Sequence, residues 1–209
     1  MRIAITTATC VLVGMAGCRS RTVPPGLAGR PSWLFSEDRC PADVFPANEV
    51  PVVYGSSACA TDLQACVDRC RAAEANACYA TALRLDELKG AEEVVQALYL
   101  RACRLGIPSG CTNRAAGLAA MEHGREDLWP CVNRTIEAMC ERKDPWACTM
   151  WGTNLARGRG TRRDLARARE ALLKGCGLGE KDRACLAAQK RLKEIEAPAK
   201  PPAAAPLPW

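Results

Sequence analysis

Eight cysteines of this 209-residue chain fall into pairs of nearly constant spacing, and this regularity constrains the fold more than any other feature. The pairs are Cys70/Cys78, Cys103/Cys111, Cys140/Cys148 and Cys176/Cys185. The second cysteine of a pair recurs after 33, 37 and 37 residues. A period in this range is typical of stacked supersecondary units, which bury their apolar faces only against their neighbours.

The segments between the cysteine pairs have the spacing of amphipathic helices, because apolar residues recur three or four positions apart. Pro130 suits the first turn of one of them. The expected buried faces are Val94, Val95, Leu98, Ala102; Val132, Ile136, Met139; Leu165, Ala168, Leu172, Leu173; and Cys185, Ala188, Leu192, Ile195. No convincing alternating run of five or more residues follows residue 56, so the sequence predicts an all-α fold.

Turn and capping signals divide these helices into hairpins. Thr61 and Gln64 form a possible capping box, which would open a helix that ends near Cys70. The pair Gly158 and Gly160 marks a turn between two helices. Three tryptophans near helix starts are expected in the core, with residues of a binding groove as the alternative: Trp129, Trp146 and Trp151. The expected unit is therefore a helical hairpin that repeats along the chain.

The chain begins with the pattern of an exported lipoprotein. Arg2 precedes an uncharged, mainly apolar run over residues 3–17, which is shorter than the about 20 residues of a membrane-spanning helix. Two small residues before Cys18 resemble a bacterial lipobox, which implies cleavage after Gly17 and acylation of Cys18. The alternative is an ordinary signal peptide followed by a chance cysteine.

Export decides how the cysteines are interpreted. Arg19 follows Cys18, which by resemblance to sorted lipoproteins favours the outer membrane of a Gram-negative cell, facing the periplasm. Of the 14 cysteines, Cys10 leaves with the signal peptide and Cys18 carries lipid, so 12 remain. An even number in an oxidising compartment predicts disulfides.

Composition divides the chain into five segments. Residues 1–17 are the predicted signal peptide, and residues 18–38 form a basic, Pro- and Gly-containing tether. Residues 39–69 hold a cysteine-containing extension and the first helix, and residues 70–196 hold the repeats. Residues 197–209 are rich in proline and alanine and predict a disordered tail.

The last full unit resembles the Sel-one-like repeat, a relative of the tetratricopeptide repeat. The matching residues are Trp151, Gly152, Gly158, Gly160, Asp164, Ala168, Ala171, Lys174 and Gly179. The cysteine pairs make the chain similar to the secreted, cysteine-rich Hcp-type subfamily, over about residues 70–195. The resemblance implies a right-handed, monomeric solenoid of about three to four repeats with a concave groove for protein partners.

In such a solenoid, the first cysteine of a pair ends one hairpin and the second begins the next. A short connection brings neighbouring helices within the Cα separation of about 4.4–6.8 Å that a disulfide needs. Each clip would contribute roughly 2–3 kcal/mol on the chain-entropy model. The alternative for paired cysteines is a zinc site, and only Cys66/Cys70 has suitable spacing.

Four cysteines stand outside the regular pairs. We expect Cys40 to tie the Pro-rich segment around it to the first helix, through Cys59 or Cys66. Cys131 has no evident partner in the sequence.

The Hcp-type resemblance also implies penicillin binding and weak β-lactamase activity, but the catalytic motifs are missing. No serine has lysine three positions later, as a serine β-lactamase requires. The single histidine, His123, cannot build a multi-histidine zinc centre and is expected to be a capping or solvent residue. We therefore expect no enzyme activity, metal or cofactor. An enzyme acting on β-lactams or peptidoglycan, and a purely structural lipoprotein, are the alternatives.

A basic strip lies in the last full unit. The 18 residues from 157 to 174 contain seven cations and only two acidic residues, Asp164 and Glu170. The cations are Arg157, Arg159, Arg162, Arg163, Arg167, Arg169 and Lys174. The strip is either a solvated face or a contact for an acidic envelope protein, lipopolysaccharide or peptidoglycan. Without Arg2 of the predicted signal peptide, 28 Lys and Arg against 23 Asp and Glu leave a mature charge of +5, which is too mild to indicate a nucleic-acid partner. The sequence predicts an envelope-anchored interaction scaffold.

Overall fold

The structure is a computed structural model that describes residues 24–35, 39–53, 55–120 and 126–197. Every regular element in these ranges is a helix, which confirms the all-α prediction. Short 3-10 helices are η1 (Pro25–Leu27), η2 (Ser56–Cys59) and η3 (Glu126–Leu128). The α-helices are α1 (Ser32–Phe35), α2 (Pro41–Val44), α3 (Leu63–Arg71), α4 (Ala75–Glu87), α5 (Glu92–Arg104), α6 (Pro108–Ala120), α7 (Trp129–Glu141), α8 (Pro145–Arg157), α9 (Leu165–Lys174) and α10 (Arg183–Glu196).

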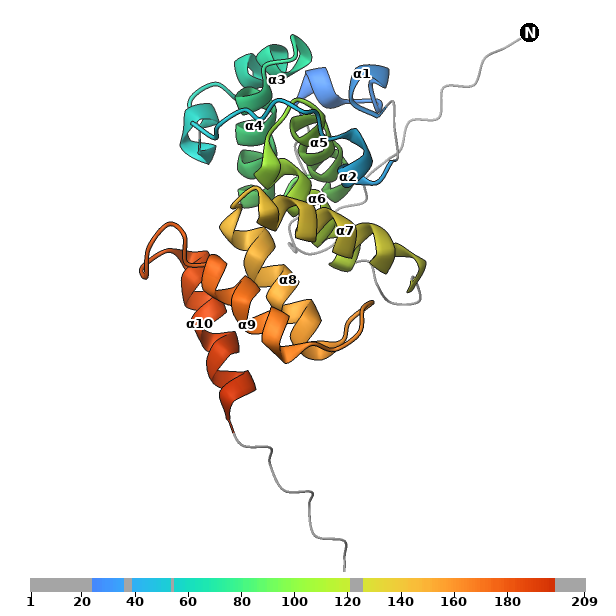
Figure 1. Cartoon of the computed structure of the whole chain (residues 1–209). Coiled ribbons are helices and arrows are strands. Elements are labelled where there is room, and N and C mark those ends of the chain that lie inside the picture. The colour runs from blue at the N-terminus through green and yellow to red at the C-terminus, as the bar shows by residue number, and fades with distance from the viewer. Residues whose placement is uncertain (1–23, 36–38, 54, 121–125, 198–209) are drawn as a thin grey trace, which may run out of the picture.

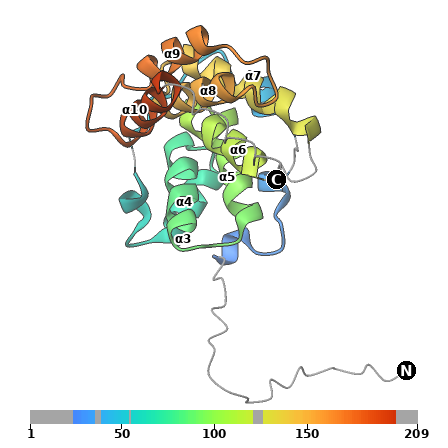
Figure 2. The same ribbon diagram turned by 90° about the horizontal axis from the view of Figure 1, so that it is seen from below.

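Successive helices pack against one another from α3 to α10. In addition, α6 contacts α8 and α8 contacts α10, so alternate helices also stack in this half of the molecule. Figure 1 shows the chain passing from α3 at one end of the molecule to α10 at the other, and Figure 2 shows the same succession from below. None of the described helices combines the length and apolar character needed to cross a membrane.

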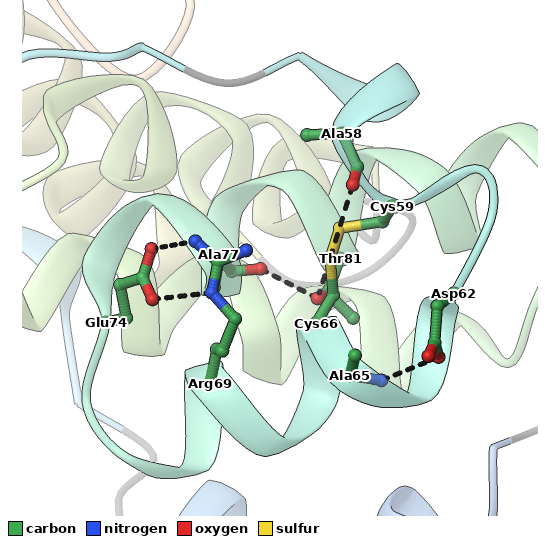
Figure 3. Close-up of a disulfide and its surroundings, with 9 residues drawn as sticks. All are labelled: Ala58, Cys59, Asp62, Ala65, Cys66, Arg69, Glu74, Ala77 and Thr81. Atoms are coloured by element: carbon green, nitrogen blue, oxygen red, sulfur yellow. Dashed lines mark hydrogen bonds and ion pairs between the residues drawn. A yellow bond between two sulfur atoms is a disulfide. The ribbon is translucent and has the colours of Figure 1, made fainter.

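Aspartates cap the N-termini of several helices. Asp62, Asp144, Asp164 and Asp182 each accept a hydrogen bond from a backbone N–H in the first turn of α3, α8, α9 and α10. The expected capping box of Thr61 and Gln64 is wrong, because Asp62 accepts from the Ala65 N–H at 2.9 Å (Figure 3). Gln64 instead donates to Asp68 within the same helix.

The same left-handed turn follows the first cysteine of each regular pair. Ala73, Gly106, Lys143 and Gly179 each stand three residues after that cysteine, with φ of 67°, 98°, 65° and 104°. In each turn the N–H of the left-handed residue donates to the carbonyl of the cysteine. The turn closes one helix and aims the next one back along it, which brings the second cysteine beside the first.

The regular cysteine pairs are disulfide-bonded in the structure. Their Cα atoms lie 4.5 Å apart in Cys70–Cys78, 4.6 Å in Cys103–Cys111, 4.4 Å in Cys140–Cys148 and 4.2 Å in Cys176–Cys185. Each bond joins the end of one helix, or the turn after it, to the start of the next helix. The disulfides therefore fix the connections between consecutive hairpins.

The expected pairing of Cys40 with Cys59 or Cys66 is wrong. Cys59 is bonded to Cys66, seven positions later, and the bond ties η2 to α3 beside Thr81 (Figure 3). Cys40 is bonded to Cys131 on α7, because α2 packs against α7 rather than against α3. Neither Cys66 nor Cys70 is left as a zinc ligand, since both are in disulfides.

Burial agrees with the helical periodicity on α5 and α7, where the expected apolar residues are all buried. It differs on α9. Leu165 is 39% exposed and Leu173 is 58% exposed, because α9 buries a narrow stripe of Ala168, Ala171 and Leu172 against its neighbours. Trp129 and Trp151 are buried as expected, whereas Trp146 is wrong as a core residue, since it is 46% exposed.

The amino-terminal part is more ordered than a tether. Residues 24–35 form η1 and α1, which bury Leu27 and Leu34 against α3 and α5. Residues 39–53, which we call the strap, include α2 and pack across α5, α6 and α7. The predicted signal peptide, Cys18, His123 and the tail from residue 198 lie outside the described residues.

Candidate functional site

The structure spreads the basic strip over three elements. Arg157 ends α8, Arg167 and Arg169 lie on α9, and the turn between these helices carries the rest of the arginines. All six arginine positions of the strip are exposed: Arg157, Arg159, Arg162, Arg163, Arg167 and Arg169. The strip thus lies on the outside of the α8–α9 hairpin, as the sequence predicted, but its members differ in their partners.

The cations on α9 are paired with carboxylates. Arg167 binds Glu137 on α7 at 2.8 Å, and Arg169 binds Glu196 on α10 at 2.5 Å. Lys174 binds Glu170 at 2.7 Å, and this hydrogen bond lowers the pKa of the Glu170 carboxyl below its ordinary value. Two of these carboxylates lie on neighbouring helices, so the charge of the strip is partly balanced by residues that are remote in sequence.

The cations of the α8–α9 turn sit on an ordered loop. Gly158 and Gly160 adopt left-handed φ values of 67° and 60°, as their position in a turn predicted. Arg163 Nε donates to the Ala156 carbonyl at 3.0 Å and so satisfies an acceptor at the end of α8. The Arg159 guanidinium lies 5.5 Å from the centre of the Trp129 ring.

Two buried asparagines hold this loop against the helices behind it. Asn154 Nδ2 donates to Asn133 Oδ1 at 2.9 Å, and Asn133 Nδ2 donates to the Arg159 carbonyl at 3.0 Å. A Cβ on Gly160 would come within 2.3 Å of Trp129 Cβ, so only glycine permits this approach. Close packing therefore positions the turn and the arginines on it.

A groove runs between α7 and α9, which we call the α7–α9 groove. Its inner hollow has a volume of about 120 Å³, with Trp151, Ala171 and the Arg167–Glu137 pair among its lining residues. Its outer hollow has about 530 Å³ and includes Lys143, Gly177 and Leu178. Cys140, Glu141 and Lys174 line both hollows. The Arg167 guanidinium lies 5.7 Å from the Trp151 ring centre.

A buried polar cluster links α4, α6 and the start of α8. Ser109 donates to Asp144 at 2.6 Å, and Asn113 donates to the Tyr79 hydroxyl at 3.4 Å. Burial, assisted by the Asp144 carboxylate, raises the pKa of Tyr79 above its ordinary value. Burial raises the pKa of the neighbouring Tyr99 as well. The phenols thus stay neutral, and the cluster joins helices rather than lining either hollow of the groove.

No cluster of three or more histidine, cysteine, aspartate or glutamate side chains in the described part of the chain could hold a metal ion. Sequence reasoning missed the α7–α9 groove, because its walls come from positions on three helices. It also missed the carboxylates opposite the strip. The only available signal was the regular cysteine spacing, which places Cys140 at the end of α7 and Cys176 just after α9.

No protein-family model, curated protein or solved structure matches the chain.

Proposed function

We propose that this chain is a non-catalytic protein-interaction module of the bacterial envelope, tethered to the membrane by acylation of Cys18. We further propose that its helices form a right-handed, monomeric solenoid of about three to four Sel-one-like repeats, facing the periplasm from the outer membrane. The paired cysteines and the helical hairpins between them support this proposal. The six disulfides in the described residues suit an oxidising compartment.

The observation that carries the proposal is the strap, because the helices bind this segment along its length. Main-chain amides of the strap donate to α4, to the turn between α5 and α6, and to α7. The bonds run from Val53 to Asn76 Oδ1 (2.9 Å), from Val50 to the Gly106 carbonyl (2.8 Å) and from Ala42 to Thr135 Oγ1 (3.3 Å). Such main-chain contacts provide affinity in peptide recognition without depending on sequence.

Side chains give the strap its specificity. Asp43 pairs with Arg134 at 2.8 Å, and Glu49 pairs with Arg142 at 3.6 Å. Phe45 packs against the disulfide-lined core of α5–α8 and lies 4.5 Å below the Arg142 guanidinium. Main-chain bonds, an apolar anchor and flanking ion pairs are the elements by which a helical surface recognises a peptide.

Two experiments test this function. Mild crosslinking of the full chain in intact envelopes should yield a discrete, saturable partner, and the purified protein should not hydrolyse nitrocefin. Nitrocefin turnover would favour the alternative β-lactam-directed enzyme of the Hcp-type family. A crosslinking pattern that never saturates would favour the purely structural alternative.

The anchor is tested separately. Cys18→Ser should release the protein from membranes or leave its signal peptide uncleaved. A variant that fractionates and migrates like the original chain would contradict the lipoprotein assignment.

A further inference from the structure

The strap fills the groove between α5 and α7. α2 contacts both helices, Cys40 is bonded to Cys131 on α7, and the Pro41 carbonyl lies against Cys103 on α5. Six groove residues contact the strap through a disulfide, a hydrogen bond, an ion pair or a close approach. They are Cys103, Gly106, Cys131, Arg134, Thr135 and Arg142.

An equivalent groove is expected one repeat unit later in the chain. A shift of 37 residues carries Cys103 of α5 onto Cys140 of α7, and a shift of 36 carries Cys140 onto Cys176 after α9. The same shifts convert the six strap-contacting residues into Cys140, Lys143, Arg167, Glu170, Ala171 and Leu178. Every one of these lines the α7–α9 groove. The two grooves are therefore equivalent positions of one repeating surface.

The backbone supports this equivalence. Gly106 and Lys143 both adopt left-handed φ, at 98° and 65°, and both donate their N–H to the preceding cysteine carbonyl at 2.9 Å. The Gly106 carbonyl accepts the strap amide of Val50 at 2.8 Å. The Lys143 carbonyl holds the corresponding place in the next unit.

The α7–α9 groove is open where the α5–α7 groove is covered. Among the described residues, its two hollows are lined by α7, α8, α9 and the turns that follow α7 and α9, with no equivalent of α2 across them. Its outer hollow of about 530 Å³ has room for several side chains of a peptide.

The charges of the open groove define a different occupant. Arg167, which binds Glu137, replaces Cys131, and an acidic residue at the position corresponding to Cys40 would share the Arg167 guanidinium with Glu137. Glu170, which binds Lys174, replaces Arg134, and a basic residue at the position corresponding to Asp43 would share the Glu170 carboxylate with Lys174. Leu178, which is 74% exposed, replaces Arg142, so the residue corresponding to Glu49 should be apolar.

We propose that the α7–α9 groove binds a Pro-containing segment of a partner protein, bound as the strap is bound one unit earlier. The segment carries an acidic residue, a basic residue three positions later and an apolar residue six positions after that. This inference rests on the proposed interaction function and names its site and the chemistry of its partner.

The probe is a labelled peptide made from strap residues 39–51 with Cys40→Glu, Asp43→Lys and Glu49→Leu. The comparison peptide carries Cys40→Ser alone. Fluorescence anisotropy with the oxidised full chain should show the charge-matched peptide binding at least about tenfold more tightly. Equal binding of the two peptides, or no binding of the charge-matched one, would overturn the proposal.

A charge swap in the protein tests the same contacts from the other side, and its melting temperature is measured as well because the swap also breaks the Arg167–Glu137 and Lys174–Glu170 pairs. Arg167→Glu with Glu170→Lys should weaken the binding of the charge-matched peptide about tenfold, and a peptide with Cys40→Lys, Asp43→Glu and Glu49→Leu should recover the loss. Arg169→Glu is the matched control, since Arg169 lies on the same helix but pairs with Glu196 on α10. An equal loss of affinity with this control, or no recovery by the swapped peptide, would contradict specific binding in the groove.

Other occupants give distinct results, each of which would overturn the proposal. Tighter binding of a peptide of residues 197–209 would assign the groove to the tail of this chain. Self-association that the Arg167/Glu170 swap abolishes would assign it to a second copy. A saturable partner in envelopes that is unaffected by the swap would leave the interaction function standing and remove only this site.

Discussion

Cys40 is disulfide-bonded to Cys131, 91 positions later, with the Cα atoms 5.6 Å apart. The other disulfides of the described residues join cysteines only seven to nine positions apart. The long-range bond therefore constrains the fold in a different way from the short bonds. It holds the strap on α7 and closes a loop that includes α2 to α6, whereas the short bonds fix individual connections.

Removal of the long-range disulfide should cost more stability than removal of a short one. On the chain-entropy model, a loop of this length contributes roughly 4–5 kcal/mol, against roughly 2–3 kcal/mol for a loop of eight residues. Urea denaturation of Cys40→Ser/Cys131→Ser should therefore show a loss about 2 kcal/mol larger than that of Cys103→Ser/Cys111→Ser. Equal losses in the two double variants would mean that the strap adds no constraint.

Gly152 on α8 packs closely against α9. A Cβ on Gly152 would lie 2.6 Å from Leu172 Cγ and 2.8 Å from the Ala168 carbonyl. Gly152→Ala should therefore destabilise the fold by about 1–3 kcal/mol, even though alanine favours a helix. Gly55→Ala is the control, because a Cβ on Gly55 would have no atom within 4 Å. A melting temperature of Gly152→Ala at or above that of the original chain would contradict this packing.

The members of the basic strip should differ in their effect on folding. Arg157→Glu with Arg162→Glu alters two exposed cations and should change the free energy of unfolding by no more than about 0.5 kcal/mol. Arg163→Glu removes the bond to the Ala156 carbonyl at the end of α8 and should cost about 1 kcal/mol. Thermal melts of the two variants check this order. A larger loss of stability in Arg157→Glu/Arg162→Glu than in Arg163→Glu would contradict it.

If the strip contacts an anionic envelope polymer, Arg157→Glu with Arg162→Glu should also bind lipopolysaccharide more weakly than the original chain does. The difference should be clear at low ionic strength and shrink as salt rises, because exposed charges are screened over about 8–10 Å at physiological salt. Co-sedimentation at two salt concentrations measures it. Identical binding at low salt would make the strip a solvated face.

Alkaline pH should weaken the fold through the buried tyrosines. The pKa values of Tyr79 and Tyr99 are raised above the ordinary value of 10.0, so the folded chain keeps protons that the unfolded chain loses. The stability they contribute is complete below pH 10.0 and falls as pH rises above it. Short-term urea denaturation across this window should show the fall, and Tyr79→Phe should reduce its slope. An unchanged slope would contradict the burial of that phenol.

The sequence predicted what depends on local pattern. The α5 face of Val95 and Leu98 follows from helical periodicity, and the turn at Gly158 follows from the glycines themselves. The regular cysteine pairs could be proposed because each pair lies within one short connection. These features needed no knowledge of which distant segments meet.

The rest depends on contacts between remote segments or on unusual local residues. Ala73 and Lys143 adopt a left-handed conformation that sequence reasoning assigns to glycine. The Cys40–Cys131 bond and the Arg167–Glu137 pair require the packing of α2 and α9 on α7. The α7–α9 groove follows from the packing of α9 beside α7, and its proposed ligand follows from the strap in the α5–α7 groove.

Disulfide mapping is the sharpest test of this architecture, because both the stacked hairpins and the strap depend on one set of bonds. The measurement is non-reducing peptide mapping by mass spectrometry of the chain isolated from an oxidising compartment. The expected bonds are Cys40–Cys131, Cys59–Cys66, Cys70–Cys78, Cys103–Cys111, Cys140–Cys148 and Cys176–Cys185. Cys103 or Cys140 found free or bonded outside its pair, or Cys40 bonded to a residue other than Cys131, would contradict it.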